Sequence, residues 1–118
     1  MSDELKLNVS LIFSKGGAQV SKLKNFSFDV TGESFVHGVQ EIGTTEEELT
    51  QIAELGTPGY VYAVNLDDTN YVEIGSTTGV YDIKLKPGEI AVWRHNSGTV
   101  YAKANTAACL VEYIIIED

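Results

Sequence analysis

The amino-acid sequence predicts an all-β protein, an antiparallel β-sandwich or jelly roll with one short helix. The second half of the chain, from Gly59 to Asp118, reads as six short apolar segments cut by turn signals. Strands spaced by about 8 to 12 residues are typical of sandwiches and jelly rolls. In the first half, apolar and polar residues alternate with a period of two, as in a half-buried strand. Residues 1–118 are predicted to form a single β-sandwich domain, since this length suits one core.

The first two strands are expected to form a hairpin. Two glycines, Gly16 and Gly17, supply the positive φ angles of a tight turn, and the chain is expected to return as a strand over residues 18–30. Before the turn, one face is expected to go inward, and its residues alternate with polar ones: Leu5, Leu7, Val9, Leu11 and Phe13. Another strand is expected over residues 35–42.

One helix is expected from Thr45 to Leu55. Thr45 and Glu48 have the spacing of a capping box, the acidic cluster suits the positive end of the helix dipole, and Gly56 and Pro58 provide the stop. These acids could instead be a catalytic pair of carboxylates, but capping accounts for them and no neighbouring group would tune such a pair.

The remaining strands are expected to follow in quick succession, over residues 60–66, 71–74, 80–85, 89–94, 100–103 and 109–116. Between two of them, Lys86 to Glu89 has Pro at the second turn position and Gly at the third, the pattern of a type II turn. The last strand is apolar on nearly both faces. Because an exposed edge strand of that kind would aggregate, we expect it to be central in a sheet or covered by another chain.

The formal net charge is −9, and the charges are segregated along the chain. Residues 25–83 carry eleven acidic side chains and no Lys or Arg, whereas all eight basic residues lie before or after that stretch. A nucleic-acid partner requires a basic face, so neither DNA nor RNA is expected to bind. The acidic stretch either keeps the protein soluble or forms a negative face complementary to a basic protein surface.

No membrane partner or secretion is expected. The longest apolar runs fall far short of the ~20 residues that cross a bilayer, and the N-terminus from Met1 to Lys6 has neither the charge nor the apolar core of a signal peptide. We therefore expect synthesis and retention in a cytoplasm.

Several residue types that often mark sites have simpler interpretations here. Cys109 is the only cysteine, and its position on an apolar strand favours a buried side chain over a reactive thiol. His37 and His95 are interpreted as a strand and a loop residue, because neither belongs to a histidine cluster. Residues 75–79 lack the lysine of a phosphate-binding loop and are expected to form a hairpin loop.

One group of oxygen-bearing side chains could bind a cation: Asp67, Asp68, Asn70 and Glu73. The glycine and the terminal glutamate of a calcium-binding EF-hand loop are missing, so a turn with Asx hydrogen bonds is favoured. The sequence therefore predicts no catalytic, cofactor-binding or metal-binding residue, no cofactor and no enzymatic activity.

Tyrosines are the candidate interface residues. Six are expected on strands, where aromatic side chains either pack the core or present large rigid contact surfaces to a partner. The candidate protein-interface residues are Tyr60, Tyr62, Tyr71, Tyr101 and Tyr113.

Four stretches of the second half form a recognisable pattern: residues 65–75 (NLDDTNYVEIG), 85–89 (LKPGE), 101–108 (YAKANTAA) and the end from Glu112. Over roughly half of the chain this pattern resembles a family of small proteins encoded by tailed bacteriophages and taken to be virion components. The family has no catalytic residues to carry over, and likeness of this kind informs about function only by association.

The resemblance implies a structural protein located in the virion and made in the host cytoplasm. Its expected role is a head decoration or cement protein, or a head-to-tail accessory subunit, that forms a homo-oligomer and contacts other virion proteins of the capsid or the head-tail junction. The alternative is a tail-associated module that binds a receptor or a glycan through an exposed aromatic patch with convergent polar groups.

Overall fold

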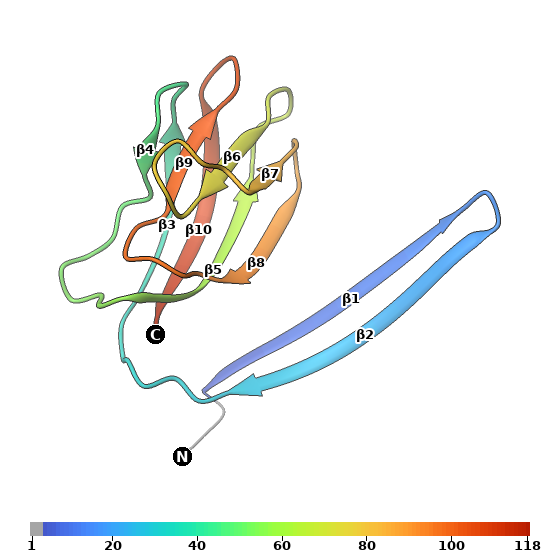
Figure 1. Ribbon diagram of the computed structural model, residues 1–118, viewed down its shortest axis with the longest axis horizontal. Coiled ribbons are helices and arrows are strands. Elements are labelled where there is room, and N and C mark those ends of the chain that lie inside the picture. Colours follow the sequence, from blue (N-terminus) through green and yellow to red (C-terminus); the bar gives the residue numbers. More distant parts are fainter. Residues whose placement is uncertain (1–3) are drawn as a thin grey trace. The chain divides into compact units, whose positions relative to one another are not determined.

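A computed structural model describes residues 4–118, and within that range it consists of strands and loops without any helix (Figure 1). The all-β prediction is thus confirmed. The chain divides into two compact units, Met1–Thr31 and Gly32–Asp118. The expected cytoplasmic location was argued from the stretch between Met1 and Lys6. Of these residues, Met1, Ser2 and Asp3 lie outside the described part of the chain.

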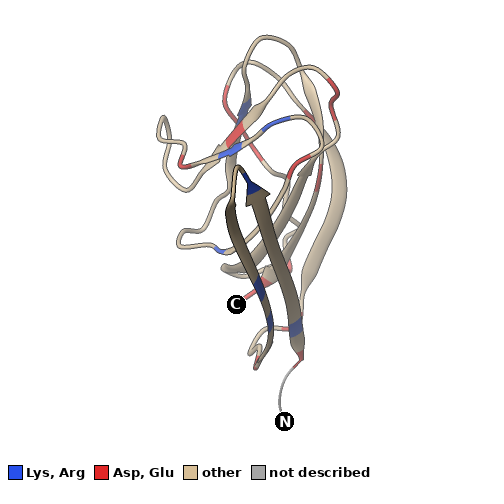
Figure 2. Cartoon of the chain, turned by 90° about the vertical axis from the view of Figure 1, so that its right-hand side faces the viewer, with Lys and Arg blue, Asp and Glu red and all other residues tan. Residues whose placement is uncertain are grey.

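The first unit is a β-hairpin. Strands β1 (Leu5–Lys15) and β2 (Ala18–Phe28) pair over eleven residues each. As predicted from the sequence, Gly16 and Gly17 form the turn with positive φ, 57° and 90°, which residues with a Cβ rarely adopt. The charged residues from Leu5 to Phe28 are four lysines, and none is acidic (Figure 2).

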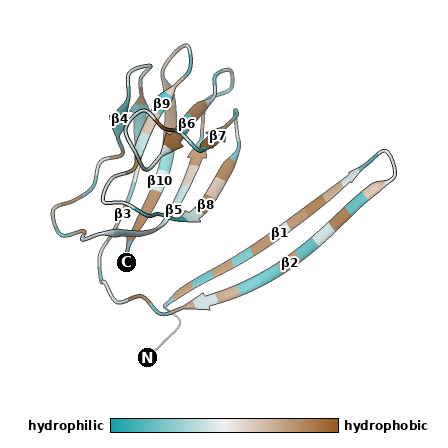
Figure 3. Cartoon of the chain, viewed as in Figure 1, coloured by the Kyte–Doolittle hydropathy of each residue, from teal (hydrophilic) through white to brown (hydrophobic). Residues whose placement is uncertain are grey.

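The register of the hairpin separates its side chains into two faces. Leu5 lies opposite Phe28, and Phe13 lies opposite Val20, so most of the apolar residues share one side. Figure 3 shows hydrophobic and hydrophilic residues alternating along both strands. The expectation that this face goes inward is not met, because Leu11 at its middle is 61% exposed. We call this side, which also carries Lys22 and Lys24, the hairpin face: Leu5, Leu7, Val9, Leu11, Phe13, Val20, Phe26 and Phe28.

The second unit is consistent with a β-sandwich of two four-stranded antiparallel sheets (Figure 1). The β10 sheet has the order β3-β10-β5-β8, and the β9 sheet has the order β4-β9-β6-β7. The strands are β3 (Phe35–Ile42), β4 (Glu47–Glu48), β5 (Pro58–Asn65), β6 (Val72–Gly75), β7 (Ile83–Leu85), β8 (Ile90–Arg94), β9 (Tyr101–Ala104) and β10 (Cys109–Glu117).

The hydrophobic core lies between the inner faces of these sheets. Successive side chains of a strand point to opposite faces, so every second residue contributes to it. The β10 sheet supplies Val61, Ala63, Val111, Tyr113 and Ile115, and the β9 sheet supplies Val72, Ile74, Leu85, Ala102 and Ala104. The last strand, β10, lies between β3 and β5, which confirms the central position expected of it.

The helix expected from Thr45 to Leu55 is wrong. This segment contains the two-residue strand β4, which pairs with β9, and the Leu49 N–H donates to the Val100 carbonyl at 2.9 Å. A helix of about eleven residues is marginal by itself and depends on a continuous buried stripe. Leu49 and Leu55 are buried, but Ile52 is exposed, so the segment follows the surface of the core as an irregular chain.

Two glutamates of the acidic cluster, which was expected at the start of the helix, bind other backbone groups. Glu47 Oε2 accepts from the Gly43 N–H at 2.7 Å, and Glu46 Oε1 accepts from the Gly79 N–H at 2.8 Å. Gln40 also holds the segment, because its side chain accepts from the Thr50 N–H and donates to the Glu48 carbonyl. Sequence spacing alone cannot distinguish such distant hydrogen bonds from a helix cap.

The turn from Lys86 to Glu89 forms as predicted. Gly88 has φ 79°, and the Glu89 N–H donates to the Lys86 carbonyl at 3.0 Å, which closes the four-residue turn. In residues 4–118 there is no helix of sufficient length and apolar character to cross a bilayer.

Candidate protein interface

The structure distributes the five candidate tyrosines over three environments. Tyr60 and Tyr62 lie on β5 and alternate with the buried residues of that strand, so they face outward from the β10 sheet. Tyr71 and Tyr101 belong to the outer side of the β9 sheet. Tyr113 is a core residue whose hydroxyl donates to the Thr50 carbonyl at 2.9 Å, and burial raises the pKa of this phenol. The tyrosines therefore do not form one patch.

The outer face of the β10 sheet is predominantly apolar. Its cross-strand register places Ile114 between His37 and Tyr62, and Tyr62 opposite Val92. Five of its large hydrophobic side chains are 39% to 60% exposed, namely Phe35, Val39, Ile90, Val92 and Leu110. We call the hydrophobic members of this surface the sheet face: Phe35, Val39, Tyr60, Tyr62, Val64, Ile90, Val92, Leu110, Ile114 and Ile116.

A few polar side chains interrupt the sheet face. His37 Nε2 lies 2.8 Å from Glu112 Oε2, and the Arg94 guanidinium lies 2.7 Å from Asp118 Oδ1. Arg94 also stands 4.8 Å from the centroid of the Tyr60 ring, a cation–π distance. Exposed ion pairs of this kind contribute little stability, so they act mainly as polar positions within an apolar surface.

The outer face of the β9 sheet has the opposite character. Glu73 on β6 lies directly across from Lys84 on one side and Lys103 on the other, so charges of opposite sign alternate across the strands. The Lys84 Nζ stands 4.2 Å from the centroid of the Tyr71 ring. An antiparallel sheet that faces water normally has this polar outer surface. The β10 sheet departs from that rule, which makes its outer face the candidate interface.

The hairpin face is a second apolar surface. Phe26 and Phe28 stack with ring centroids 5.8 Å apart, and the Lys24 Nζ stands 5.7 Å from the Phe26 ring. A two-stranded hairpin is at best marginally stable in water by itself. Eight apolar residues on one face therefore imply that the hairpin gains stability by packing against another surface.

The loops that carry the recognised sequence pattern meet at one end of the sandwich. Asn65 is fully buried; its Nδ2 donates to the carbonyls of Asn70 and Leu85 at 3.0 and 2.9 Å, and its Oδ1 accepts from the Asp67 N–H. Its backbone N–H and carbonyl bond Glu89 and Gly88 of the LKPGE turn. Asn65 thus connects two stretches of the pattern.

The third stretch joins the same cluster through Asn105. Its side-chain oxygen accepts from the Tyr71 N–H at 3.1 Å, and its own N–H donates to the Tyr71 carbonyl. Thr106 donates to the Asn70 side chain, and burial raises the pKa of the Cys109 thiol nearby. The pattern therefore encodes a network of loop hydrogen bonds that supports the fold, and the buried thiol agrees with the sequence interpretation.

The acidic loop after β5 forms the predicted Asx turn. The Asp67 carboxylate accepts from the N–H groups of Asn70 and Thr69, at 2.6 and 3.0 Å. These two hydrogen bonds, the Asn70 bond first, hold the pKa of Asp67 below its usual value. Among the described residues, no three His, Cys, Asp or Glu side chains converge in a way that could hold a metal ion.

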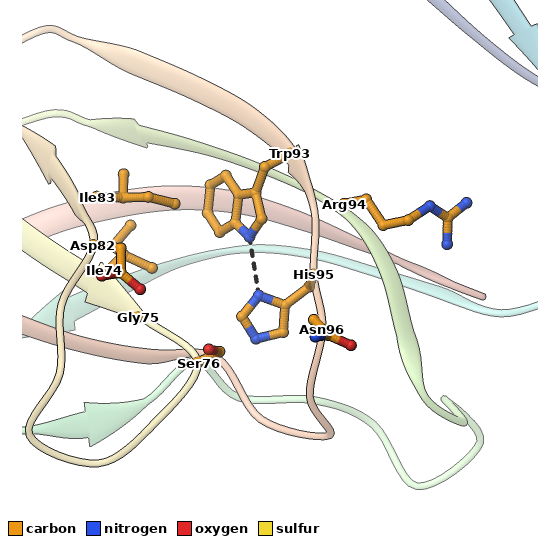
Figure 4. Close-up of a pocket in the computed structure, with 9 residues that line it drawn as sticks. All are labelled: Ile74, Gly75, Ser76, Asp82, Ile83, Trp93, Arg94, His95 and Asn96. Atoms are coloured by element: carbon orange, nitrogen blue, oxygen red, sulfur yellow. Dashed lines mark hydrogen bonds between the residues drawn. The ribbon is translucent and has the colours of Figure 1, made fainter.

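A pocket of about 210 Å³ opens between the ends of β6 and β8 (Figure 4). His95 lines it, together with Trp93, whose indole N–H donates to His95 Nδ1 at 2.9 Å. The Nδ1 atom is therefore the acceptor of a neutral ring, and the protonated Nε2 faces the Thr99 carbonyl at 2.7 Å. Both nitrogens are occupied, so His95 fixes the loop after β8 and offers no free base to a pocket ligand. The volume also lies below the roughly 300 Å³ at which ligand pockets begin.

Glu46 and Tyr81 form a hydrogen-bonded pair outside the sheet face. The Tyr81 hydroxyl donates to Glu46 Oε1, the atom that also accepts from the Gly79 N–H. This bond raises the pKa of Tyr81 to about 12, and the bonds from Tyr81 and Gly79 lower the pKa of Glu46. The pair ties the segment before β4 to the loop before β7, so its evident contribution is structural.

The sequence did not identify the aliphatic members of the sheet face. Val39, Ile90 and Val92 look like ordinary strand residues, and only the pairing of four strands from distant parts of the chain brings them together. The one available signal was β10, which is apolar on nearly both faces. Its central position satisfies its backbone hydrogen bonds, but it leaves its outward side chains uncovered.

No model of a known protein family matches the chain, and the comparison with curated proteins likewise gives no match.

Proposed function

We propose that the protein is a non-enzymatic structural subunit that acts through protein–protein contacts, most specifically a head decoration, cement or head-to-tail accessory subunit of a tailed-bacteriophage virion. The observation that carries the structural role is the sheet face. One outer surface of the sandwich is apolar and the other is charged, so the apolar surface is suited to contact with a partner. The virion setting comes from the resemblance in the second half of the sequence.

The other surfaces support a contact role better than a chemical one. In the pocket between β6 and β8, both ring nitrogens of His95 are engaged in hydrogen bonds. The loop cluster around Asn65 is occupied by its own hydrogen bonds. Two apolar surfaces, the sheet face and the hairpin face, then have no assigned role. Both are suited to burial against protein.

A tail-associated glycan-binding module is the second candidate. Glycan sites use exposed aromatic rings with convergent polar groups. Tyr60 and Tyr62 are outward-facing rings on one strand, with Arg94 beside the first of them. Aliphatic side chains surround them, however, and such surfaces bind protein better than sugar.

Mass spectrometry of purified virions from the encoding phage tests this proposal. The protein is expected as a stoichiometric component, and recombinant protein added to particles that lack it is expected to bind them and co-sediment. Its absence from virions, combined with failure to bind capsids, would reject the structural role. Binding of the isolated protein to host cells or to a glycan array would favour the second candidate.

A further inference from the structure

We infer that the hairpin face of one copy docks on the sheet face of a second copy, so that copies of this chain assemble by exchanging hairpins. The inference rests on the proposed function, because it names the occupant of the surface through which the subunit is proposed to act. Both surfaces are apolar, both are built on strands, and a hairpin laid on a sheet gives the aligned packing that sandwiches use.

Charge favours the contact between a hairpin and a sheet over the two symmetrical contacts, hairpin on hairpin and sandwich on sandwich. The hairpin from Leu5 to Phe28 carries four lysines and no acid, whereas residues 32–118 carry fourteen acidic and four basic side chains, a net charge of −10. Hairpin on hairpin would oppose Lys22 and Lys24 to their own copies, and sandwich on sandwich would oppose two acidic bodies. Hairpin on sheet brings opposite charges together, which favours encounter and fixes the choice of partner.

The polar positions within the two faces are complementary as well. Lys22 and Lys24 interrupt the hairpin face, opposite Leu11 and Val9. Glu41 and Glu112 interrupt the sheet face, and they occupy neighbouring cross-strand rows beside Leu110 and Val39. The charged side chains of the hairpin face are thus all positive. The outer face of the β10 sheet presents two carboxylates, with His37 beside Glu112 and with Arg94 paired to Asp118.

The dimensions require each copy both to give and to receive a hairpin. A strand of eleven residues is about 37 Å long, and a two-stranded ribbon is about 10 Å wide, so one contact covers about 370 Å² on each partner. That is about half of the 800 Å² per partner that a stable interface needs. Two contacts per copy, one given and one received, reach about 740 Å², as in a two-fold dimer or a closed ring.

The experiment uses full-length protein and two double variants. The hairpin variant carries Leu11→Ser and Phe13→Ser, and its matched control carries Ile12→Ser and Leu23→Ser, on the opposite side of the same strands. The sheet variant carries Val39→Ser and Ile90→Ser. Its control carries Ile52→Ser and Val80→Ser, which are also exposed but lie outside the sheet face.

Oligomeric state is measured by light scattering during size exclusion and by native mass spectrometry, with one partner labelled with nitrogen-15. The wild type and both controls are expected to be oligomers. The hairpin variant and the sheet variant are each expected to weaken self-association at least about 100-fold, as two interface anchors do, and to run as monomers. Mixed together, the two variants can form one of the two hairpin–sheet contacts, because one supplies an intact hairpin face and the other an intact sheet face. They are therefore expected to bind each other more tightly than either variant binds itself, but more weakly than the wild type self-associates.

The remaining outcomes overturn the inference. A hairpin variant that still assembles would indicate contacts between sheet faces, and a sheet variant that still assembles would indicate contacts between hairpins. A monomeric wild type, or two variants that bind each other no more tightly than either binds itself, would indicate packing within one copy or a different partner. Circular dichroism and melting curves of each variant separate loss of assembly from loss of fold.

The two proposals fail separately. Protein that is present in virions but does not exchange hairpins would keep the structural role and reject the inference. Protein that exchanges hairpins but is absent from virions would keep the inference and reject the structural role in the virion.

Discussion

At the scale of single residues, buried polar side chains determine where the loops lie. Asn65 is the clearest case, because one fully buried amide bonds three backbone groups in the loop after β5 and at the end of β7. A buried donor or acceptor that loses its partner costs more free energy than the hydrogen bond contributes. The loop cluster of the second half therefore depends on this residue.

Replacing Asn65 by alanine is expected to lower the free energy of unfolding by about 3 kcal/mol, since it leaves buried carbonyls and an N–H without partners. Urea denaturation followed by tryptophan fluorescence measures the effect. The control is Asn96→Ala, at an exposed position, which is expected to change little. Equal stability of the two variants would contradict the assigned role.

The Glu46–Tyr81 pair is expected to make part of the stability dependent on acid. Since the hydrogen bonds from Tyr81 and Gly79 lower the pKa of Glu46 in the folded chain below its ordinary value of 4.5, the folded state favours the carboxylate. This contribution is fully present well above pH 4.5 and is lost as the pH falls through the lowered value. Melting temperatures between pH 7 and pH 3 should fall less steeply for Glu46→Gln than for the wild type. Glu54→Gln, at an exposed loop position, should retain the wild-type slope.

At the scale of elements, the segment between β3 and β5 shows how a local signal can mislead. Its capping spacing and its acids predict a helix, yet the segment pairs with β9 and sends its glutamates to other turns. Its side chains are buried where the segment contacts the core, and the spacing of the buried residues has no helical period.

This segment is expected to respond unevenly to truncation. Leu49→Ala removes a fully packed side chain and should lower the free energy of unfolding by about 2–4 kcal/mol, whereas Ile52→Ala, at an exposed position, should cost far less. Thermal unfolding of the two variants gives the comparison. Similar losses at both positions would support the helical stripe in place of the observed chain path.

At the scale of the whole molecule, charge is divided between the two units. The hairpin from Leu5 to Phe28 carries four lysines and no acidic residue, whereas residues 32–118 have a net charge of −10. Between copies this division would favour assembly over nonspecific contact.

Self-association by hairpin exchange is therefore expected to weaken as salt rises. The Debye length falls from about 10 Å at 0.1 M to under about 5 Å near 0.5 M, so attraction between the two units is screened. Sedimentation at increasing NaCl concentration gives the dissociation constant. In the variant Lys22→Gln with Lys24→Gln, association should be weaker at low salt and less dependent on salt. An unchanged salt dependence would assign the attraction to other groups.

The sequence by itself determined the strands and several turns. Residues 35–42 were expected as a strand and form β3, and the glycines at 16, 17 and 88 take the positive φ angles that their turns require. These features are local: alternation and backbone freedom are read from neighbouring residues. The same local information placed Asp67 in an Asx turn.

Only the tertiary structure decided which faces point to solvent and which residues share a surface. Alternation along β5 shows that Tyr60 and Tyr62 lie on one side, but not which side is buried, and β10 is apolar on both. That choice follows from pairing β3, β10, β5 and β8, which lie far apart in the sequence. The same long-range contacts buried Tyr113, replaced the expected helix by an irregular segment, and assembled the sheet face, because strand pairing and core packing join residues that no local pattern connects.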